Sequence, residues 1–246
     1  MRVAAVTGAS RGLGRAIAEA LAAQGHAVAC LGRDLDALNE TADRVRGAGG
    51  CVSLHTADVG DPNFAEPFVN ETVAEHGGLD LVVNCAGVLG DKPAAEMSAQ
   101  EYLRVLSVNL VAAFALSSAA YPHLRTRAGA VVVNIGSFYS SIGVPGFAAY
   151  ASSKAGMEGL TRTLAVEWAR DGIRVVCVAP GYIATDMLQG ALADERMAGR
   201  IMSRIPLGRV ATAEEIAEVV CFLASPAAAF ITGATLIADG GQVVKI

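Results

Sequence analysis

The sequence is poor in charged residues and in long hydrophobic runs, and each shortage excludes a class of protein. Charged residues make up 17% of the 246 residues, and the formal net charge is −5. The chain therefore lacks the basic field that attracts nucleic acids, and we expect no nucleic-acid partner. Gly, Arg, Asp or Glu interrupts every apolar run before it reaches the roughly 18 residues of a membrane span, so we expect no membrane insertion. The 53% of hydrophobic residues instead predict a large globular core.

Signal-peptide, disulfide and metal-ligand patterns are lacking as well. Met1 to Val6 has the composition of a strand rather than of a signal-peptide core, so we do not expect export. An odd number of widely spaced cysteines, mostly inside apolar segments, predicts buried free thiols and a cytoplasmic location; they are Cys30, Cys51, Cys85, Cys177 and Cys221. The histidines lack metal-ligand spacing, so we interpret each as a surface or loop residue and expect no metal; they are His26, His55, His76 and His123.

Short β-branched runs alternate with longer amphipathic segments along the whole chain. Strands are expected at Arg2 to Thr7, His26 to Leu31, Cys51 to Thr56, Leu79 to Asn84, Ala130 to Ile135, Ile173 to Ala179 and Thr235 to Ala238. Helices are expected at Gly14 to Gln24, Leu35 to Arg46, Phe64 to His76, Gln100 to Tyr121, Ala151 to Ala169 and Ala213 to Leu223. Continuous apolar strands are typical of a parallel sheet buried on both faces. We therefore predict an α/β, single-domain Rossmann fold, with a doubly wound seven-stranded parallel sheet and helices on both faces.

No linker or repeat divides the chain, so residues 1–246 are expected to form one domain. The one long segment between strands runs from Gly181 to Thr212 and carries Met187, Met197 and Met202. It follows the end of a strand, where ligands of open α/β sheets bind. We therefore predict a substrate lid at about 185–211.

A glycine-rich turn, Thr7 to Gly14, joins the first strand to the first helix. Free backbone N–H groups at the start of this helix are suited to a dinucleotide pyrophosphate. At the end of the second strand an acidic residue would select NAD, but Arg33 stands there. Arg33 and Arg11 therefore favour the 2′-phosphate of NADP. The alternative is that both arginines are ordinary surface charges and Asp34 binds the ribose of NAD.

Tyr150 and Lys154 lie four residues apart at the start of an expected helix, so their side chains share one face. A phenol is a poor base at neutral pH, but a neighbouring ammonium stabilises the phenolate. The pair therefore fits acid–base chemistry on a substrate proton. Alone the pair is weak evidence for a catalytic site, because Tyr and Lys occur at this spacing by chance on many helices.

In its full set of motifs the sequence resembles the short-chain dehydrogenase/reductase family. The motifs occur in order along the whole chain: Thr7 to Gly14, Asp58-Val59, Asn84-Cys85-Ala86-Gly87, Asn109, Ser137, Tyr150 to Lys154, and Pro180-Gly181. Each residue alone has a structural explanation, such as ending a strand or starting a turn, but the ordered set argues against it. One departure is Cys85, where the family often has a second asparagine, which is expected to weaken a local hydrogen-bond link.

The resemblance implies a role for each matching residue. Ser137 would orient the substrate carbonyl, Tyr150 would be the general acid or base, Lys154 would bind the nicotinamide ribose, and Asn109 would hold a water for proton relay. With the turn residues, the expected cofactor contacts are Gly8, Ser10, Arg11, Gly12, Leu13, Gly14, Arg33, Asp58, Val59, Asn84, Ala86, Gly87, Tyr150, Lys154, Pro180, Gly181, Ile183 and Thr185. The implied reaction is hydride transfer between NADP(H) and a small-molecule carbonyl or secondary alcohol.

Within the family, the chain is most similar to 3-oxoacyl-(acyl-carrier-protein) reductases, through the segments 181–187, 205–209 and 231–233. An acyl carrier protein is acidic, and Arg125, Arg127 and Arg170 are candidate contacts for it, although Asp171 stands where those reductases often carry a cation. Two other functions stay open. One is an NAD(H)-dependent secondary-alcohol or polyol dehydrogenase; the other is a non-catalytic dinucleotide-binding sensor. The resemblance also implies a homotetramer.

Overall fold

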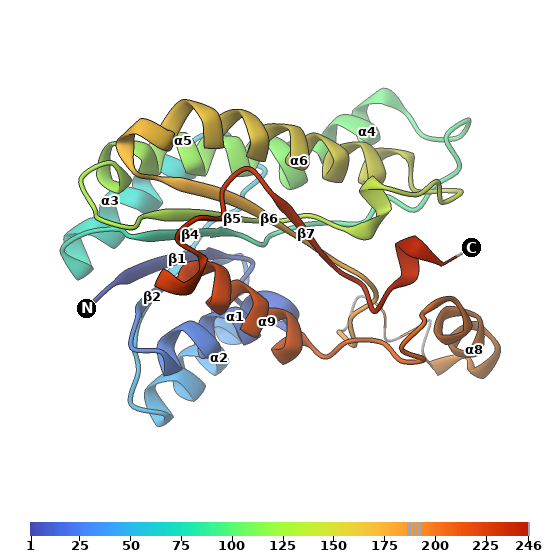
Figure 1. Ribbon diagram of the computed structural model, residues 1–246, viewed down its shortest axis with the longest axis horizontal. Helices are drawn as coiled ribbons and strands as arrows, with labels where there is room; N and C mark the ends of the chain where they lie inside the picture. The colour runs from blue at the N-terminus through green and yellow to red at the C-terminus, as the bar shows by residue number, and fades with distance from the viewer. Residues whose placement is uncertain (186–187, 189, 191–192, 246) are drawn as a thin grey trace.

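The computed structural model describes residues 1–245 except 186–187, 189 and 191–192, and a seven-stranded parallel sheet forms its centre (Figure 1). The strands are β1 (Val3–Thr7), β2 (Ala27–Gly32), β3 (Cys51–Thr56), β4 (Leu81–Asn84), β5 (Val131–Ile135), β6 (Arg174–Pro180) and β7 (Thr235–Ala238). Their order is β3-β2-β1-β4-β5-β6-β7, which reverses direction between β1 and β4. This is the predicted doubly wound sheet, and the prediction of the fold is confirmed.

Helices cover both faces of the sheet, with α1, α2 and α9 on one side and α3, α5 and α6 on the other (Figure 1). The described helices are α1 (Gly12–Ala23), α2 (Leu35–Gly47), α3 (Ala65–His76), α4 (Ala99–Leu106), α5 (Ala112–Leu124), α6 (Ala148–Trp168), α8 (Glu195–Arg204) and α9 (Ala213–Ala224). A π-helical turn, η1 (Ser107–Val111), joins α4 to α5, and short 3-10 turns are η2 (Phe138–Ser140), η3 (Ala169–Asp171), η4 (Pro226–Ala228) and η5 (Gln242–Val244).

The central strands are rigid because both of their faces are buried. Along β1, Ala4 and Val6 pack against the α1 and α9 side, whereas Val3 and Ala5 pack against the α3 and α5 side. Burial of each valine contributes roughly 1.5–3 kcal/mol. The carboxyl ends of β1, β4, β5 and β6 are therefore firm supports for the side chains that follow them.

The segment predicted as one helix from Gln100 to Tyr121 contains an irregularity that its sequence does not signal. At η1 the helix widens to π geometry, and this turn carries Asn109, which is only 1% exposed. An extra residue in one helical turn changes the apolar spacing very little, so periodicity does not detect it. Such turns occur frequently at functional sites.

The helical run Ala99–Leu124 also has the length and the mean hydropathy, 1.6, of a membrane span. The prediction that no stretch approaches such a span did not anticipate it. In the fold, Leu116, Ala120 and Leu124 of this run pack into the core beside β4 and β5, as in a core helix of a globular domain. Its outer face exposes Leu103 and Phe114.

One of the histidine predictions is wrong. His55 is a strand residue that is 6% exposed, rather than a surface or loop residue, whereas His26 lies in the loop before β2, although it is buried as well. His55 lies in β3 and faces α3, where Ser53 and Glu71 hydrogen-bond its two ring nitrogens. Partners on another element therefore allow this polar ring to be buried. All five cysteines are free thiols as predicted, although Cys51 is exposed and Cys85 only half-buried.

Candidate active site

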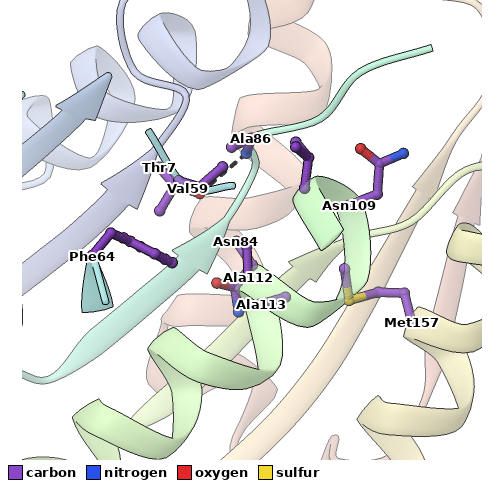
Figure 2. Close-up of a pocket in the computed structure, with 10 residues that line it drawn as sticks. Thr7, Val59, Phe64, Asn84, Ala86, Asn109, Ala112, Ala113 and Met157 are labelled. Atoms are coloured by element: carbon purple, nitrogen blue, oxygen red, sulfur yellow. Dashed lines mark hydrogen bonds between the residues drawn. The ribbon is translucent and has the colours of Figure 1, made fainter. Parts of the chain in front are cut away.

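Strand ends β1 and β4 are tied together at the centre of the site. The Thr7 hydroxyl accepts a hydrogen bond from the backbone N–H of Cys85, at 3.0 Å, and one from that of Ala86, at 3.1 Å. The bond to Ala86 is drawn in Figure 2. Beside this link Figure 2 shows a small cavity, lined by Thr7, Val59, Phe64, Asn84, Ala86, Val108, Asn109, Ala112, Ala113 and Met157. The predicted residues Val59, Asn84, Ala86 and Asn109 thus converge at one edge of the sheet.

The glycine turn is shaped by close backbone approach. A Cβ on Gly14 would lie 2.2 Å from the carbonyl oxygen of Gly8, and a Cβ on Gly8 would lie 2.9 Å from the Ala86 Cα. Gly8 and Gly12 also have positive φ angles, +70° and +54°, which favour glycine. Helix α1 begins directly at Gly12, and its N-cap, Arg11, makes no side-chain cap. Its first N–H groups are therefore suited to an anion.

The other side of the turn faces the end of β2. The Ser10 Oγ lies 3.3 Å from where a Cβ of Gly32 would stand, so Ser10 sits beside Arg33. A hollow opens here, lined by Ser10, Arg11, Arg33, Asp34, Leu35, Asp36 and Ala37. Arg33 lies 3.8 Å from the carboxylate of Asp58, and both side chains are exposed. The Asp34 carboxylate instead caps α2, accepting the N–H of Ala37 at 3.1 Å.

Tyr150 and Lys154 lie in the first two turns of α6, as their spacing predicts. The Lys154 Nζ is 5.7 Å from the centre of the Tyr150 ring. Lys154 is buried, and its Nζ donates a hydrogen bond of 2.7 Å to the carbonyl oxygen of Ile135 at the end of β5. A Cβ on Gly87 would lie 3.8 Å from this Nζ, so the segment after β4 passes close to the lysine.

Asn109 connects this segment to α6. Its Oδ1 accepts the N–H of Val88 at 2.8 Å, while its Nδ2 donates to the Val88 carbonyl and to the Ser153 Oγ, each at 3.0 Å. The Asn109 side chain therefore holds the strand β4 exit against the residue that precedes Lys154.

Asn84 lies deeper in the sheet. Its Nδ2 donates to Asn134 at 2.8 Å and to Ser117 at 3.1 Å, and Asn134 in turn donates to Thr161 of α6 at 2.9 Å. These buried amides link β4, β5 and α6 below the site. The adjacent Cys85 packs its side chain against the apolar α1 and α9 side, and burial raises the pKa of its thiol to about 12.

Ser137 follows β5 and is buried, and its hydroxyl accepts the N–H of Tyr139 at 3.2 Å. The next turn is pinned to α6 because the Ser140 hydroxyl donates to Glu158 at 2.5 Å. This contact holds the Ser137 loop against the helix of Tyr150.

One aromatic residue at the site, Tyr139, belongs to no sequence motif and was missed, and its partner Tyr182 was noted only as part of the segment 181–187. The Tyr139 ring meets the Tyr150 ring edge-on at 5.7 Å, and the Tyr139 hydroxyl lies 3.2 Å from the Tyr182 hydroxyl. Burial raises the pKa of Tyr139, and its hydrogen bond with Tyr182 adds to that rise. The partners are 43 residues apart in the chain, so only packing brings them together.

The segment after β6 closes the site from the other side. Gly181 lies against the Asp239 backbone, which a Cβ would approach to 2.7 Å, and Thr185 lies 3.5 Å from where a Cβ of Gly12 would stand. Ile183 forms an isolated β-bridge with Ala211 and packs against the same apolar core as Leu13. Pro180, which ends β6, thus leads into a segment that reaches the glycine turn. Met187, predicted in the lid, lies outside the described residues.

The arginines predicted to contact an acyl carrier protein do not lie beside Tyr150 and Lys154 of their own chain. Arg127 forms two hydrogen bonds with Asp80, near the start of β4. Arg125 lies 3.9 Å from Asp171, and Arg170 follows the carboxyl end of α6, about 30 Å along that helix from Tyr150. Two of these arginines are thus ion-paired, and all three lie at the edge of the sheet opposite Tyr150. The prediction that they contact an acyl carrier protein at the mouth of the site is therefore contradicted for a single chain.

Known proteins resemble this chain along almost its whole length. A family model described as enoyl-(acyl carrier protein) reductase matches residues 8–242. The 3-oxoacyl-(acyl-carrier-protein) reductase FabG of Escherichia coli K12 is 40% identical over 241 residues, covering 98% of this chain and 97% of that protein. The cis-4-hydroxycyclohexanecarboxylate dehydrogenase of Sinomonas cyclohexanicum is 37% identical, covering 98% and 96%.

A solved structure of a putative 2-deoxy-D-gluconate 3-dehydrogenase from Agrobacterium tumefaciens, with bound NADP, has a TM-score of 0.93 and 39% identity, covering 99% of this chain and 97% of that one. The chain belongs to the short-chain dehydrogenase/reductase family. The predicted family is thereby confirmed. As a member of it, the protein is an oxidoreductase that acts on CH–OH groups, or the corresponding carbonyls, with NAD(P).

Proposed function

We propose that this short-chain dehydrogenase/reductase is an NADP(H)-dependent reductase of ketones, a 3-oxoacyl thioester or a related apolar carbonyl, with Tyr150 as general acid. The observation that carries the proposal is the convergence of Tyr150, Lys154, Asn109 and the Ser137 loop beside the glycine turn. All of them lie where ligands of open α/β sheets bind.

The residues present fit an NADP molecule. The glycine turn leaves no room for Cβ atoms at Gly8 and Gly14, and the uncapped start of α1 suits the pyrophosphate. Arg11 and Arg33 line one hollow and would bind the 2′-phosphate, because Asp34 is engaged in capping α2. Asp58 and Val59 would contact the adenine, Asn84 to Gly87 the ribose beside it, and Pro180 to Ile183 with Thr185 the nicotinamide.

A bound NADPH supplies the hydride, and the chain's own residues manage the proton. The Ser137 hydroxyl orients the substrate carbonyl, and the Tyr150 hydroxyl donates its proton to the carbonyl oxygen. Lys154, held by the Ile135 carbonyl, binds the nicotinamide ribose and stabilises the Tyr150 phenolate. A water at Asn109 then relays a proton back toward the tyrosine.

The region 185–211 is proposed as a lid over the substrate within a single domain. Its helix α8 buries Ile201 and exposes Met197 and Met202, which suit an apolar ligand. The similarity to FabG favours a 3-oxoacyl thioester, with acyl carrier protein as a possible carrier, whereas the similarity to cis-4-hydroxycyclohexanecarboxylate dehydrogenase favours a ring-bearing substrate.

Exposed apolar residues support a homotetramer. One set lies on the outer face of the α4–α5 run and consists of Leu103, Val111 and Phe114. The other set consists of Phe230, which precedes β7, and Leu236, which lies in β7 at the edge of the sheet. Together they form two separate apolar surfaces, as an assembly with two interfaces requires. A monomeric mass in solution would reject the tetramer. The free cysteines support a cytoplasmic location.

The test is the oxidation of NADPH and, separately, NADH with 3-oxoacyl thioesters, diketones and cyclic ketones. Tyr150→Phe should lower kcat by at least about 100-fold, because it removes the proton donor, while NADPH binding followed by fluorescence is retained. Tyr121→Phe is the matched control, since Tyr121 hydrogen-bonds Asp171 far from the site.

Each outcome separates the candidate functions. A preference for NADH would favour the alternative of an NAD(H)-dependent secondary-alcohol or polyol dehydrogenase, with the same Tyr150. NADPH binding without turnover of any carbonyl would favour a non-catalytic sensor, and full activity of Tyr150→Phe would refute the proposed mechanism.

A further inference from the structure

The hydroxyl pair Tyr139–Tyr182 forms a polar spot inside an aromatic wall. The Tyr139 ring meets the rings of Tyr150 and Phe147 edge-on, at 5.7 and 5.1 Å, and Phe138 meets Tyr182 at 5.1 Å. In the pair one hydroxyl donates to the other at 3.2 Å. The second O–H is then left to donate to another acceptor, and the contact of the Tyr139 ring with Tyr150 places the pair next to the proposed proton donor.

The end of helix α8, which carries Arg204, is brought near Tyr182 by the fold. Gly181, which precedes Tyr182, packs on the Asp239 backbone, while Ile205, which follows Arg204, packs on Gly240, where a Cβ would lie 2.7 Å from its Cγ2. Leu207 also donates its N–H to the Gly240 carbonyl. One turn after β7 thus brings Tyr182 and the end of α8 together. The charge of Arg204 reaches Tyr139, because it opposes the rise that burial causes in the pKa of that phenol.

The charge of Arg204 is not neutralised by an ion pair within the described part of the chain, and its side chain is exposed. The nearest acid in the turn, Asp239, accepts the backbone N–H groups of Gly241 and Val243, at 2.8 and 2.7 Å. A second cation, Lys245, donates its Nζ to the Ser203 carbonyl at 2.5 Å. This corner is therefore basic in a protein whose net charge is −5.

We propose that the substrate carries a carboxylate, bound by Arg204 and by the free hydroxyl of the Tyr139–Tyr182 pair, on a ring that packs against the aromatic wall. A guanidinium and a phenol provide charge-assisted hydrogen bonds to a carboxylate. The inference rests on the ketone reduction of the proposed function, but it replaces the apolar carbonyl substrate with a ring-bearing oxo acid. With NADPH bound, Tyr150 would give its proton to the ketone oxygen while the cofactor would supply the hydride to the ketone carbon, so that a hydroxy acid and NADP⁺ would form.

The test compares 4-oxocyclohexanecarboxylate with its neutral carboxamide as substrates for NADPH oxidation. In Arg204→Gln the KM for the carboxylate should rise by at least about tenfold, the effect of losing a hydrogen bond to a charged group, while the KM for the amide stays within about twofold. Tyr182→Phe should also raise the KM for the carboxylate more than the KM for the amide. Arg200→Gln, one turn earlier on α8, is the matched control and should leave both values unchanged.

A binding measurement makes the test independent of turnover. Calorimetric titration of the NADP⁺-loaded protein with cyclohexanecarboxylate should show binding that Arg204→Gln weakens and salt reduces. Equal effects of Arg204→Gln on the acid and the amide, or no binding of the acid by the wild type, would overturn the inference. Turnover of neutral ketones that still depends on Tyr150 would leave the proposed function standing in that case. Loss of all Tyr150-dependent turnover would instead refute the proposed function.

Discussion

At the scale of single residues, Arg33 and Asp34 are neighbours in the chain but have different partners. The Asp34 carboxylate caps the N-terminus of α2. Arg33 instead lines the hollow beside the glycine turn and lies 3.8 Å from the Asp58 carboxylate. An exposed pair of this kind is weak, so a ligand phosphate can displace Asp58 at little cost. We therefore expect Arg33 to contribute to the preference for one dinucleotide over the other.

Replacing Arg33 tests this preference directly. Arg33→Gln should raise the KM for NADPH by about tenfold, because a charge-assisted hydrogen bond to the 2′-phosphate is lost, and leave the KM for NADH nearly unchanged. Arg46→Gln, in the last turn of α2, is the control. An equal change in the KM values for NADPH and NADH would show that Arg33 does not bind the 2′-phosphate.

At the scale of elements, the π-helical turn between α4 and α5 positions Asn109. The turn directs one amide at both Val88 and Ser153, so three separate segments are joined by a single side chain. Because Ser153 precedes Lys154 and Val88 follows Gly87, this bridge determines how the β4 exit lies against the catalytic helix.

Removing the bridge should affect both stability and catalysis. Asn109→Ala leaves the Val88 N–H without its partner, which costs about 1–3 kcal/mol, so the melting temperature should fall. We also expect kcat to fall by at least about tenfold, since proton relay is lost. Asn70→Ala, on the exposed side of α3, is the control. Unchanged kcat in a destabilised Asn109→Ala would limit this residue to a structural role.

At the scale of the whole molecule, the edge of the sheet opposite the site is held by a buried carboxylate. Asp80 is 5% exposed and accepts hydrogen bonds from the Val3 N–H at 2.8 Å and from Arg127 at 2.9 and 3.1 Å. Burial acts to raise the pKa of Asp80, but the hydrogen bonds from Arg127 and Val3 outweigh it and hold the pKa below 3.8. The ionised carboxylate thus joins β1, β4 and the chain before β5.

Because the folded-state pKa of Asp80 is lowered, its contribution to stability is present above the unfolded pKa, near 4, and is lost as the pH falls through the folded value. Asp80→Asn should therefore lower the free energy of unfolding by about 2 kcal/mol at pH 7, and the difference should shrink below about pH 4. Urea denaturation at both pH values measures it, with the exposed Asp43→Asn as control. A difference that persists at low pH would contradict the electrostatic account.

Sequence patterns determined the sheet, the family, and the residues expected at the site. Apolar strands such as β5 and the periodic helices indicate the fold because secondary structure follows local side-chain spacing. The glycine turn and the Tyr150–Lys154 pair are also recognised from short stretches of sequence. Because both follow strands of a parallel sheet, the sequence also predicted that they lie at the same edge of that sheet.

Only the tertiary structure decided which distant side chains meet. The burial of His55, the Tyr139–Tyr182 pair and the π turn at Asn109 leave no periodic signal, because each depends on contacts between elements. Charge shows the same limit. Arg127 looked available in the sequence but is paired with Asp80, whereas Arg204, at the end of α8, belongs to no motif and has no ion pair among the described residues. Composition counts cations, but packing determines which of them keep a free charge for a ligand.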